Sequence, residues 1–97
     1  MFARVITFEG KAAKVDEGIR NYREKVVPTI KNWHGFTHAY LLVDRKTGVE
    51  VSVVLWETEK DVQGSSEGAL QLRSQFAQVV GADKPPTVRD FEVAEQA

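Results

Sequence analysis

Four segments of the chain have the apolar, β-branched and aromatic composition of β-strands. Side chains along each segment must alternate between two faces, because successive residues of a strand point in opposite directions. The short spacing between the second and third segments, from Asp44 to Gly48, predicts a hairpin turn in which Gly48 takes a positive φ. These two strands are therefore expected to be neighbours. The predicted strands are residues 2–9, 36–43, 49–56 and 87–93.

The first stretch between strands changes to a helical period. From about Val15, apolar residues recur every three or four positions and fall on one helix face. Pro28 lies within this pattern, and it predicts a kink or a broken last turn because proline lacks a backbone N–H and clashes with the preceding turn. Gly35 is the expected stop. The apolar face consists of Ile19, Tyr22, Val26, Ile30 and Trp33.

The second helical stretch opens with a capping pattern. Thr58 is followed by the acidic Asp61 three positions on, which predicts a one-turn helix that ends at Gly64. Ser65 and Ser66 are then expected to cap the main second helix. The buried stripe of that helix is predicted to be Ala69, Leu72, Phe76, and Val79 or Val80.

The order of these elements is β-α-β-β-α-β, which is the split βαβ arrangement of ferredoxin-like folds. We expect an α+β fold in which a four-stranded antiparallel sheet carries two helices on one face. No linker, low-complexity tract or charge block divides the chain, and its length of 97 residues suits one domain. Residues 1–97 are therefore predicted to form a single ferredoxin-like domain.

Both faces of the predicted sheet are largely apolar, whereas an antiparallel sheet with one wet face alternates cleanly between apolar and polar residues. Two helices can cover only one of these faces. The other face would expose a larger apolar patch than soluble monomers usually tolerate. A homodimer that joins two sheets is the expected solution. In the third strand, Val51, Val53 and Leu55 form one set, and Ser52, Val54 and Trp56 form the other.

Composition narrows the functions that the chain can have. It is 42% hydrophobic and 28% charged and has no cysteine, which excludes disulfides, thiolate catalysis and cysteine-ligated zinc. Its formal net charge of −1 gives no basic patch, so no nucleic-acid partner is expected. No apolar run approaches the roughly 18 residues of a transmembrane helix, and no signal-peptide pattern follows Met1. We expect no membrane association and a cytoplasmic location.

One group of residues has the composition of a ligand pocket. His38 and Tyr40 share a face of the second strand, and Ser52 and Trp56 of the neighbouring strand are candidates for the same face. An imidazole, two hydroxyls and an indole among aliphatic residues form a mostly apolar site with a few orienting polar groups. His38 is the candidate catalytic residue, since histidine can act as a general base near neutral pH. The alternative is that these side chains fill the core or a dimer interface.

Other catalytic and cofactor motifs are missing. His34 and His38 are the only histidines, and they flank Gly35 without a nearby carboxylate, so no metal site is predicted. The sequence has no Gly-x-Ser-x-Gly elbow and no glycine-rich phosphate loop. No cofactor is expected.

Several segments are similar to a known group of proteins. They are Pro28 followed by an apolar helix end, Trp33-His34-Gly35-Phe36 at the second strand, the third strand 49–56, and the strand exit Trp56-Glu57-Thr58. In these features the chain resembles the dimeric α/β-barrel superfamily, and within it the antibiotic biosynthesis monooxygenase (ABM) domains. The resemblance implies a homodimer. It does not imply one activity, because such relatives include monooxygenases, haem-degrading enzymes, isomerases, lyases and decarboxylases.

The relatives with known activities have characteristic residues that can be compared with this sequence. Haem-degrading relatives pair a third-strand Trp with an Asn on the first strand and a His on the second helix. Trp56 matches the Trp, but the first strand has no Asn and the second helix has no His. Relatives that oxidise polycyclic aromatic phenols place an Asn four residues before the Trp, where this chain has Ser52. Of these characteristic residues, only the Trp has a counterpart in this chain, at Trp56.

Two functions follow from these observations. The first is a homodimeric ABM-like protein that binds a small apolar or aromatic molecule between sheet and helices, as a cofactor-independent monooxygenase. The second is a non-catalytic ligand-binding or structural dimer. A nucleic-acid regulator is disfavoured, because no helix-turn-helix segment is left once all six elements are assigned.

Overall fold

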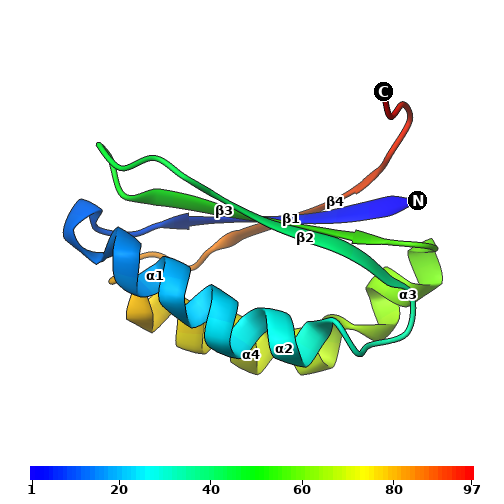
Figure 1. Cartoon of the computed structure of the whole chain (residues 1–97), viewed down its shortest axis with the longest axis horizontal. Helices are drawn as coiled ribbons and strands as arrows, with labels where there is room; N and C mark the ends of the chain where they lie inside the picture. Colours follow the sequence, from blue (N-terminus) through cyan, green and yellow to red (C-terminus); the bar gives the residue numbers. More distant parts are fainter.

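The computed structural model describes residues 1–97 and contains one four-stranded sheet (Figure 1). The strand order is β2-β3-β1-β4, and every neighbouring pair is antiparallel. The predicted ferredoxin-like arrangement is confirmed, and the fourth strand ends one residue earlier than predicted. The strands are β1 (Phe2–Glu9), β2 (Phe36–Val43), β3 (Val49–Trp56) and β4 (Thr87–Glu92).

The first helical run begins with a short 3-10 turn, Ala12–Lys14, and continues as α1 (Val15–Asn21). A π-helical turn, Tyr22–Val26, then joins α1 to α2 (Val27–Ile30). Pro28 lies in the first turn of α2, and the wider π-turn before it accommodates the missing N–H. The irregularity predicted around Pro28 is therefore present.

The second helical run consists of α3 (Glu59–Gly64) and α4 (Ser66–Val79). Thr58 caps α3 as predicted, because its side chain accepts a hydrogen bond from the Asp61 backbone N–H. The predicted Ser65 cap of α4 is wrong. The Ser65 hydroxyl instead donates to the Val62 carbonyl at 2.7 Å, so it closes the end of α3. None of the helices has the length and apolar character that crossing a bilayer needs.

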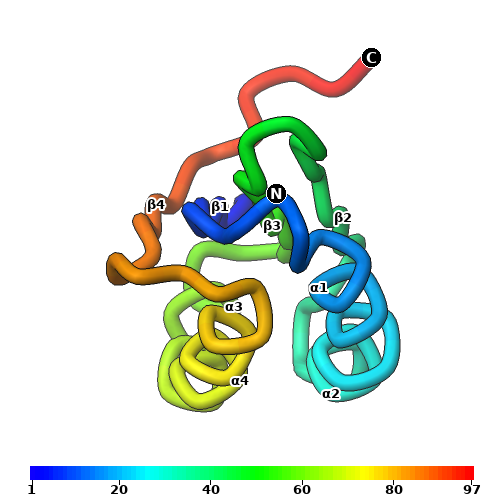
Figure 2. The backbone as a smooth tube through the Cα atoms, turned by 90° about the vertical axis from the view of Figure 1, so that its left-hand side faces the viewer, coloured from blue at the N-terminus to red at the C-terminus, as the bar shows by residue number.

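Both helical runs pack on the same face of the sheet, side by side (Figure 2). The core lies between the two layers in two clusters of buried apolar residues. One cluster is Ile6, Phe8, Tyr22, Phe76 and Val80, and the other is Ile30, Val54, Trp56 and Val62.

The hairpin between β2 and β3 decides which side chains meet the helices. Gly48 takes a φ of +85°, as its turn position predicts, and the resulting register places Leu41 opposite Ser52. Both side chains lie on the helix side of the sheet, where Ser52 is buried and Leu41 packs against the core. Residues that are even-numbered on β3 therefore share a face with residues that are odd-numbered on β2.

A β-bulge changes this alternation at the start of β2. The pairing shifts between Phe36 and His38, so Thr37 is an extra residue on the strand. Phe36 consequently lies on the helix side, with its ring centroid 6.0 Å from that of Trp56. Without the bulge, simple alternation along β2 would place Phe36 on the same face as His38 and Tyr40.

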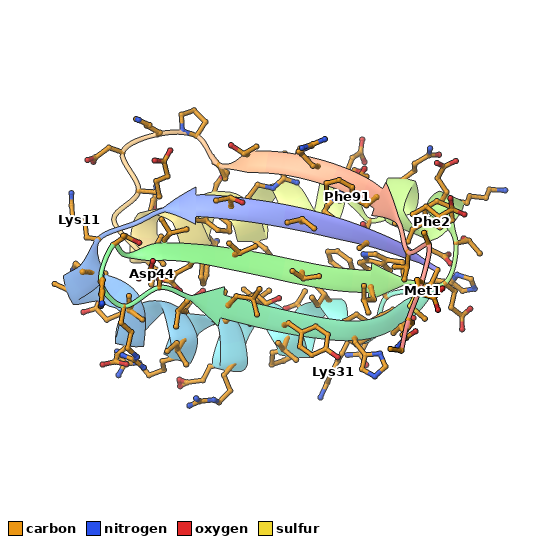
Figure 3. All side chains as sticks on the ribbon, turned by 90° about the horizontal axis from the view of Figure 1, so that it is seen from above. Met1, Phe2, Lys11, Lys31, Asp44 and Phe91 are labelled. Atoms are coloured by element: carbon orange, nitrogen blue, oxygen red, sulfur yellow. The ribbon has the colours of Figure 1, made fainter.

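No helix covers the other face of the sheet, and only the C-terminal tail passes over one end of it (Figure 3). Three of its large hydrophobic side chains are strongly exposed: Tyr40 at 51%, Leu42 at 54% and Phe91 at 43%. The predicted apolar second face is therefore present. We call this surface the open face. It consists of Ala3, Val5, Thr7, His38, Tyr40, Leu42, Val51, Val53, Leu55, Arg89 and Phe91.

Candidate functional site

A cavity of about 60 Å³ lies inside the protein, between the sheet and the two helical runs. We call it the inner cavity. Strands β1 and β3 form one wall, and the π-turn, α2 and α4 form the other. Most of its lining is aliphatic or aromatic, as in Ile6, Phe8, Val26, Ile30, Val54 and Phe76.

Arg4 is one of the two charged residues that line the inner cavity. It lies on the helix side of β1 and is buried, and its Nε and Nη2 donate to the two Asp90 carboxylate oxygens at 2.8 and 3.1 Å. This forked pairing holds the guanidinium plane in place and lowers the pKa of Asp90. The third nitrogen, Nη1, is buried and has no acceptor.

Arg73 reaches the same cavity from α4. Its Nε is buried without an acceptor. Burial, together with the neighbouring Arg4 charge, lowers the pKa of the Arg73 guanidinium, while Asp90 acts in the opposite direction. Asp90 is paired with Arg4 and acts on Arg73 only through its charge, so two guanidinium groups here are offset by one carboxylate and this end of the inner cavity has an excess of positive charge.

Hydroxyl groups and an indole complete the polar part of the site. The Tyr22 and Ser52 hydroxyls form a buried hydrogen bond of 2.8 Å between the π-turn and β3. Burial raises the pKa of the Tyr22 phenol, and the bond to Ser52 opposes that effect only in part. Trp56, which is buried, has an indole Nε1–H without an acceptor. The inner cavity thus offers donors rather than a base.

The four residues that the sequence analysis grouped in one pocket lie on opposite sides of the sheet. Ser52 and Trp56 line the inner cavity. His38 and Tyr40 lie on the open face, where their rings stack with centroids 6.3 Å apart. The prediction that all four share a face is wrong, because the hairpin register places Tyr40 opposite Val53 and not opposite Ser52. His38 therefore cannot act as a base for a ligand in the inner cavity.

Arg4, Tyr22 and Arg73 line the inner cavity but were not predicted from the sequence as site residues. Arg4 had a visible signal, because it interrupts the otherwise apolar set of Phe2, Ile6 and Phe8 on one face of the first strand. A charge within such a set indicates either a partner or a site. Tyr22 and Arg73 gave no comparable signal, because each lies in an ordinary helical pattern.

Haem and metal ions do not fit this donor set. Haem iron needs an axial ligand such as histidine, and neither His34 nor His38 lines the inner cavity. The phenol of Tyr22 is engaged with Ser52. No group of three or more histidine, aspartate or glutamate side chains converges anywhere in the structure.

No protein-family profile matches the chain. Among curated proteins, it is 30% identical over 94 residues to the uncharacterized protein Rv2557 of Mycobacterium tuberculosis. It is also 32% identical over 77 residues to the uncharacterized protein Rv2558 of the same organism. These alignments cover 97% and 79% of the chain but only 41% and 33% of the relatives. The chain thus spans about two fifths of the length of Rv2557.

Solved structures provide the clearest comparison. One is a monooxygenase from the Streptomyces coelicolor gene ActVA-Orf6, in complex with nanaomycin D. It superposes with a TM-score of 0.81 at 20% sequence identity, and the alignment covers 99% of this chain and 89% of the monooxygenase chain. The Mycobacterium tuberculosis haem degrader MhuD, with two haems in its active site, has a TM-score of 0.73 at 17% identity, with coverages of 100% and 99%. An antibiotic biosynthesis monooxygenase scores 0.69 at 17% identity, with coverages of 98% and 100%. Over its whole length, therefore, the chain has the fold of the antibiotic biosynthesis monooxygenases.

Proposed function

We propose that the protein binds, in the inner cavity, a small aromatic molecule that carries an anionic or carbonyl oxygen. The observation that carries this proposal is a set of three buried N–H donors without acceptors, on Arg4, Trp56 and Arg73. Each unpaired donor costs on the order of 1–3 kcal/mol, which a ligand oxygen would recover. The aliphatic and aromatic lining suits the body of such a ligand.

The charge balance favours an anion over a neutral ligand. Asp90, which is itself partly exposed, pairs with Arg4, and it is the one carboxylate whose charge acts on Arg73. Attraction between the excess positive charge and an anion is stronger in this buried place than in water, because solvent screens it less. A phenolate or carboxylate is therefore the expected oxygen group.

For the chemistry, we propose oxidation of a bound phenol by O₂ without a cofactor. The two guanidinium groups favour the phenolate form, which is a better electron donor than the phenol. A phenol with a free ring position then takes up one oxygen atom as a quinone carbonyl, and the other oxygen leaves as water with two hydrogens, one from the phenol hydroxyl and one from the oxidised ring carbon. The ring supplies all four electrons. The monooxygenase among the structural neighbours supports this proposal.

A specific observation favours the alternative, a binding protein without catalysis. The inner cavity contains no histidine and no free carboxylate, so no side chain there can remove a proton from the ligand. In the alternative, the anion is bound and released unchanged.

Titration calorimetry with 1-hydroxy-2-naphthoate tests the binding proposal. We expect the wild type to bind it, and Arg73→Gln to weaken binding by about 10–100-fold, because a hydrogen bond to a charged group contributes roughly 1.5–3 kcal/mol. Arg23→Gln is the matched control: it removes the same charge from an exposed position on the π-turn and should leave affinity within about twofold. Equal affinities in all three proteins would contradict the assignment of the site.

Oxygen uptake separates the two proposed functions. Incubation with 1-naphthol should consume one O₂ for each naphthoquinone formed, and ¹⁸O₂ should deliver one labelled atom to the product. Because the guanidinium groups stabilise the phenolate, Arg73→Gln should slow the reaction more than Arg23→Gln does. Binding of the naphthol without any oxygen uptake would leave the non-catalytic function.

We further propose that the working protein is a homodimer joined through the open face. Strands β3 and β1 supply the aliphatic centre of this face, through Val5 and Val53, and the outer strands supply Tyr40 and Phe91. Such a surface is larger and more continuous than the scattered apolar residues of ordinary monomers. A second copy of the chain, related by a two-fold axis, covers it with an identical surface. Two-fold dimers are the commonest soluble oligomers.

A further inference from the structure

A second, larger pocket lies next to the inner cavity. It has a volume of about 350 Å³ and is lined mainly by polar residues and glycines of the 33–34 loop, α3 and the start of α4. We call it the outer pocket. Trp33 and Ser65 line both the outer pocket and the inner cavity. The Trp33 ring therefore forms part of the wall between them.

The Trp33 ring is only partly enclosed by the protein. It stacks on Trp56 with centroids 6.4 Å apart, and it rests on the bare backbone of Gly68, where an added Cβ would come within 2.9 Å of the ring. The side chain is only half-buried. By contrast, Trp56 is almost fully buried against Phe36 and the sheet. Trp33 is thus the movable part of the aromatic wall.

The loop that carries Trp33 is anchored at the next residue. His34 Nδ1 lies 2.7 Å from Asp61 Oδ1, and the Thr58 hydroxyl donates to Asp61 Oδ2 at 2.8 Å. Gly35 lies so close to this carboxylate that no Cβ would fit. These contacts tie the backbone next to Trp33 to α3, so the part of the wall that we expect to move is the Trp33 side chain.

The volumes indicate what this wall does. Ligand pockets usually measure roughly 300–1,000 Å³, so the inner cavity alone is small for an aromatic ligand of several rings. Opening the wall at Trp33 would join it to the outer pocket and bring the combined site into that range. The outer pocket also supplies Lys60, a second place for a polar or anionic substituent.

We propose that the inner cavity and the outer pocket are two parts of one elongated ligand site, and that Trp33 determines the length of aromatic ligand that it accepts. This inference rests on the proposed function, because it assigns the substrate range of the same cavity. Anions of one or two rings fit behind Trp33. Fused three-ring anions need its side chain to move aside.

Paired titrations with salicylate and anthracene-2-carboxylate test this inference, since the two probes share a carboxylate and differ in length. Trp33→Ala should raise the affinity for the three-ring probe at least 10-fold relative to salicylate, and Trp33→Phe should give an intermediate ratio. Gly68→Ala displaces the ring and should change the ratio at least threefold. Gln71→Ala is the control, because Gln71 is exposed on α4 and lines neither the inner cavity nor the outer pocket.

The outcomes are distinct. If both probes bind but the affinity ratio is the same in the wild type, Trp33→Phe and Gly68→Ala, the role of Trp33 is overturned and the proposed function stands. If neither probe binds to any of the proteins, the proposed function fails and this inference fails with it. Thermal melts of each variant identify a protein that has not folded. Should Trp33→Ala fail to fold, the milder substitutions Trp33→Phe and Gly68→Ala decide the result.

Discussion

At the scale of single residues, Glu50 is the most unusual position in the chain. Its side chain is 0% exposed, and neither carboxylate oxygen has a hydrogen-bond partner. The carboxyl group lies against Gly18 of α1, where an added Cβ would come within 2.6 Å of it. A glycine inside a helix lowers helix stability by about 1 kcal/mol relative to alanine. Gly18 therefore makes room for the Glu50 carboxyl group at the expense of the stability of α1. Burial raises the pKa of Glu50 to about 7.

This raised pKa makes the stability of the protein depend on pH. Between the ordinary glutamate pKa and about 7, the folded state binds more protons than the unfolded state, so the free energy of unfolding falls as pH rises through this window. The shift from 4.5 to about 7 corresponds to about 3 kcal/mol. Glu50→Gln removes this titration, and its stability relative to the wild type should rise by up to that amount between pH 5 and pH 8.

Urea melts at pH 5, 6, 7 and 8 measure this difference. The pKa of His34 is raised by its hydrogen bond to Asp61, and this pair also loses stability as pH rises, but the contribution is common to both proteins and cancels. Glu17→Gln, an exposed change in the first turn of α1, is the control and should track the wild type. A constant difference between Glu50→Gln and the wild type across this range would show that Glu50 does not titrate as proposed.

At the scale of elements, the parts that could be predicted from the sequence depend on local interactions. The strand and helix patterns, the positive φ of Gly48 and the Thr58 cap each involve residues within a few positions of one another. The Ser65 cap was wrong because two adjacent helices compete for one hydroxyl, and the end of α3 takes it. The helix irregularity near Pro28 was predicted, but its form as a π-turn was not.

The faces of the sheet could not be assigned from the sequence alone. Alternation divides the side chains of each strand between two faces. Which side chains of neighbouring strands share a face depends on the hairpin register, and a shift of one residue moves every side chain of a strand to the opposite face. The bulge at Thr37 adds a second shift. For this reason Ser52 and Trp56 were correctly found together but were combined with two residues of the open face. Arg4 and Arg73 meet only in the tertiary fold, since β1 and α4 lie far apart in sequence.

At the scale of the whole molecule, the two faces of the sheet have separate roles in the proposals above. The helix side encloses the inner cavity, and the open face carries the exposed Tyr40 and Leu42 together with Phe91, which is labelled in Figure 3. Arg89 lies 4.9 Å above the Phe91 ring on that face, which shields one edge of the apolar surface with a charge. The apolar centre has no such shield. The proposed dimer contact and the proposed ligand site therefore involve different residues and can be tested independently.

Light scattering tests the dimer directly. At micromolar concentration the wild type should show about twice the chain mass of 10.9 kDa. Val53→Asp places a carboxylate at the centre of the open face, where an unpaired charge would be buried in the dimer but solvated in the monomer. We therefore expect a folded monomer, with a circular dichroism spectrum like that of the wild type.

The matched control for this variant is Leu70→Asp, which introduces the same charge at an exposed apolar position on α4, away from the open face. It should remain a dimer. Because Val53 does not line the inner cavity, the Val53→Asp monomer should also retain affinity for 1-hydroxy-2-naphthoate if each subunit forms its own site. A wild-type protein that remains a monomer at high micromolar concentration would show that the open face is not a contact between copies of this chain.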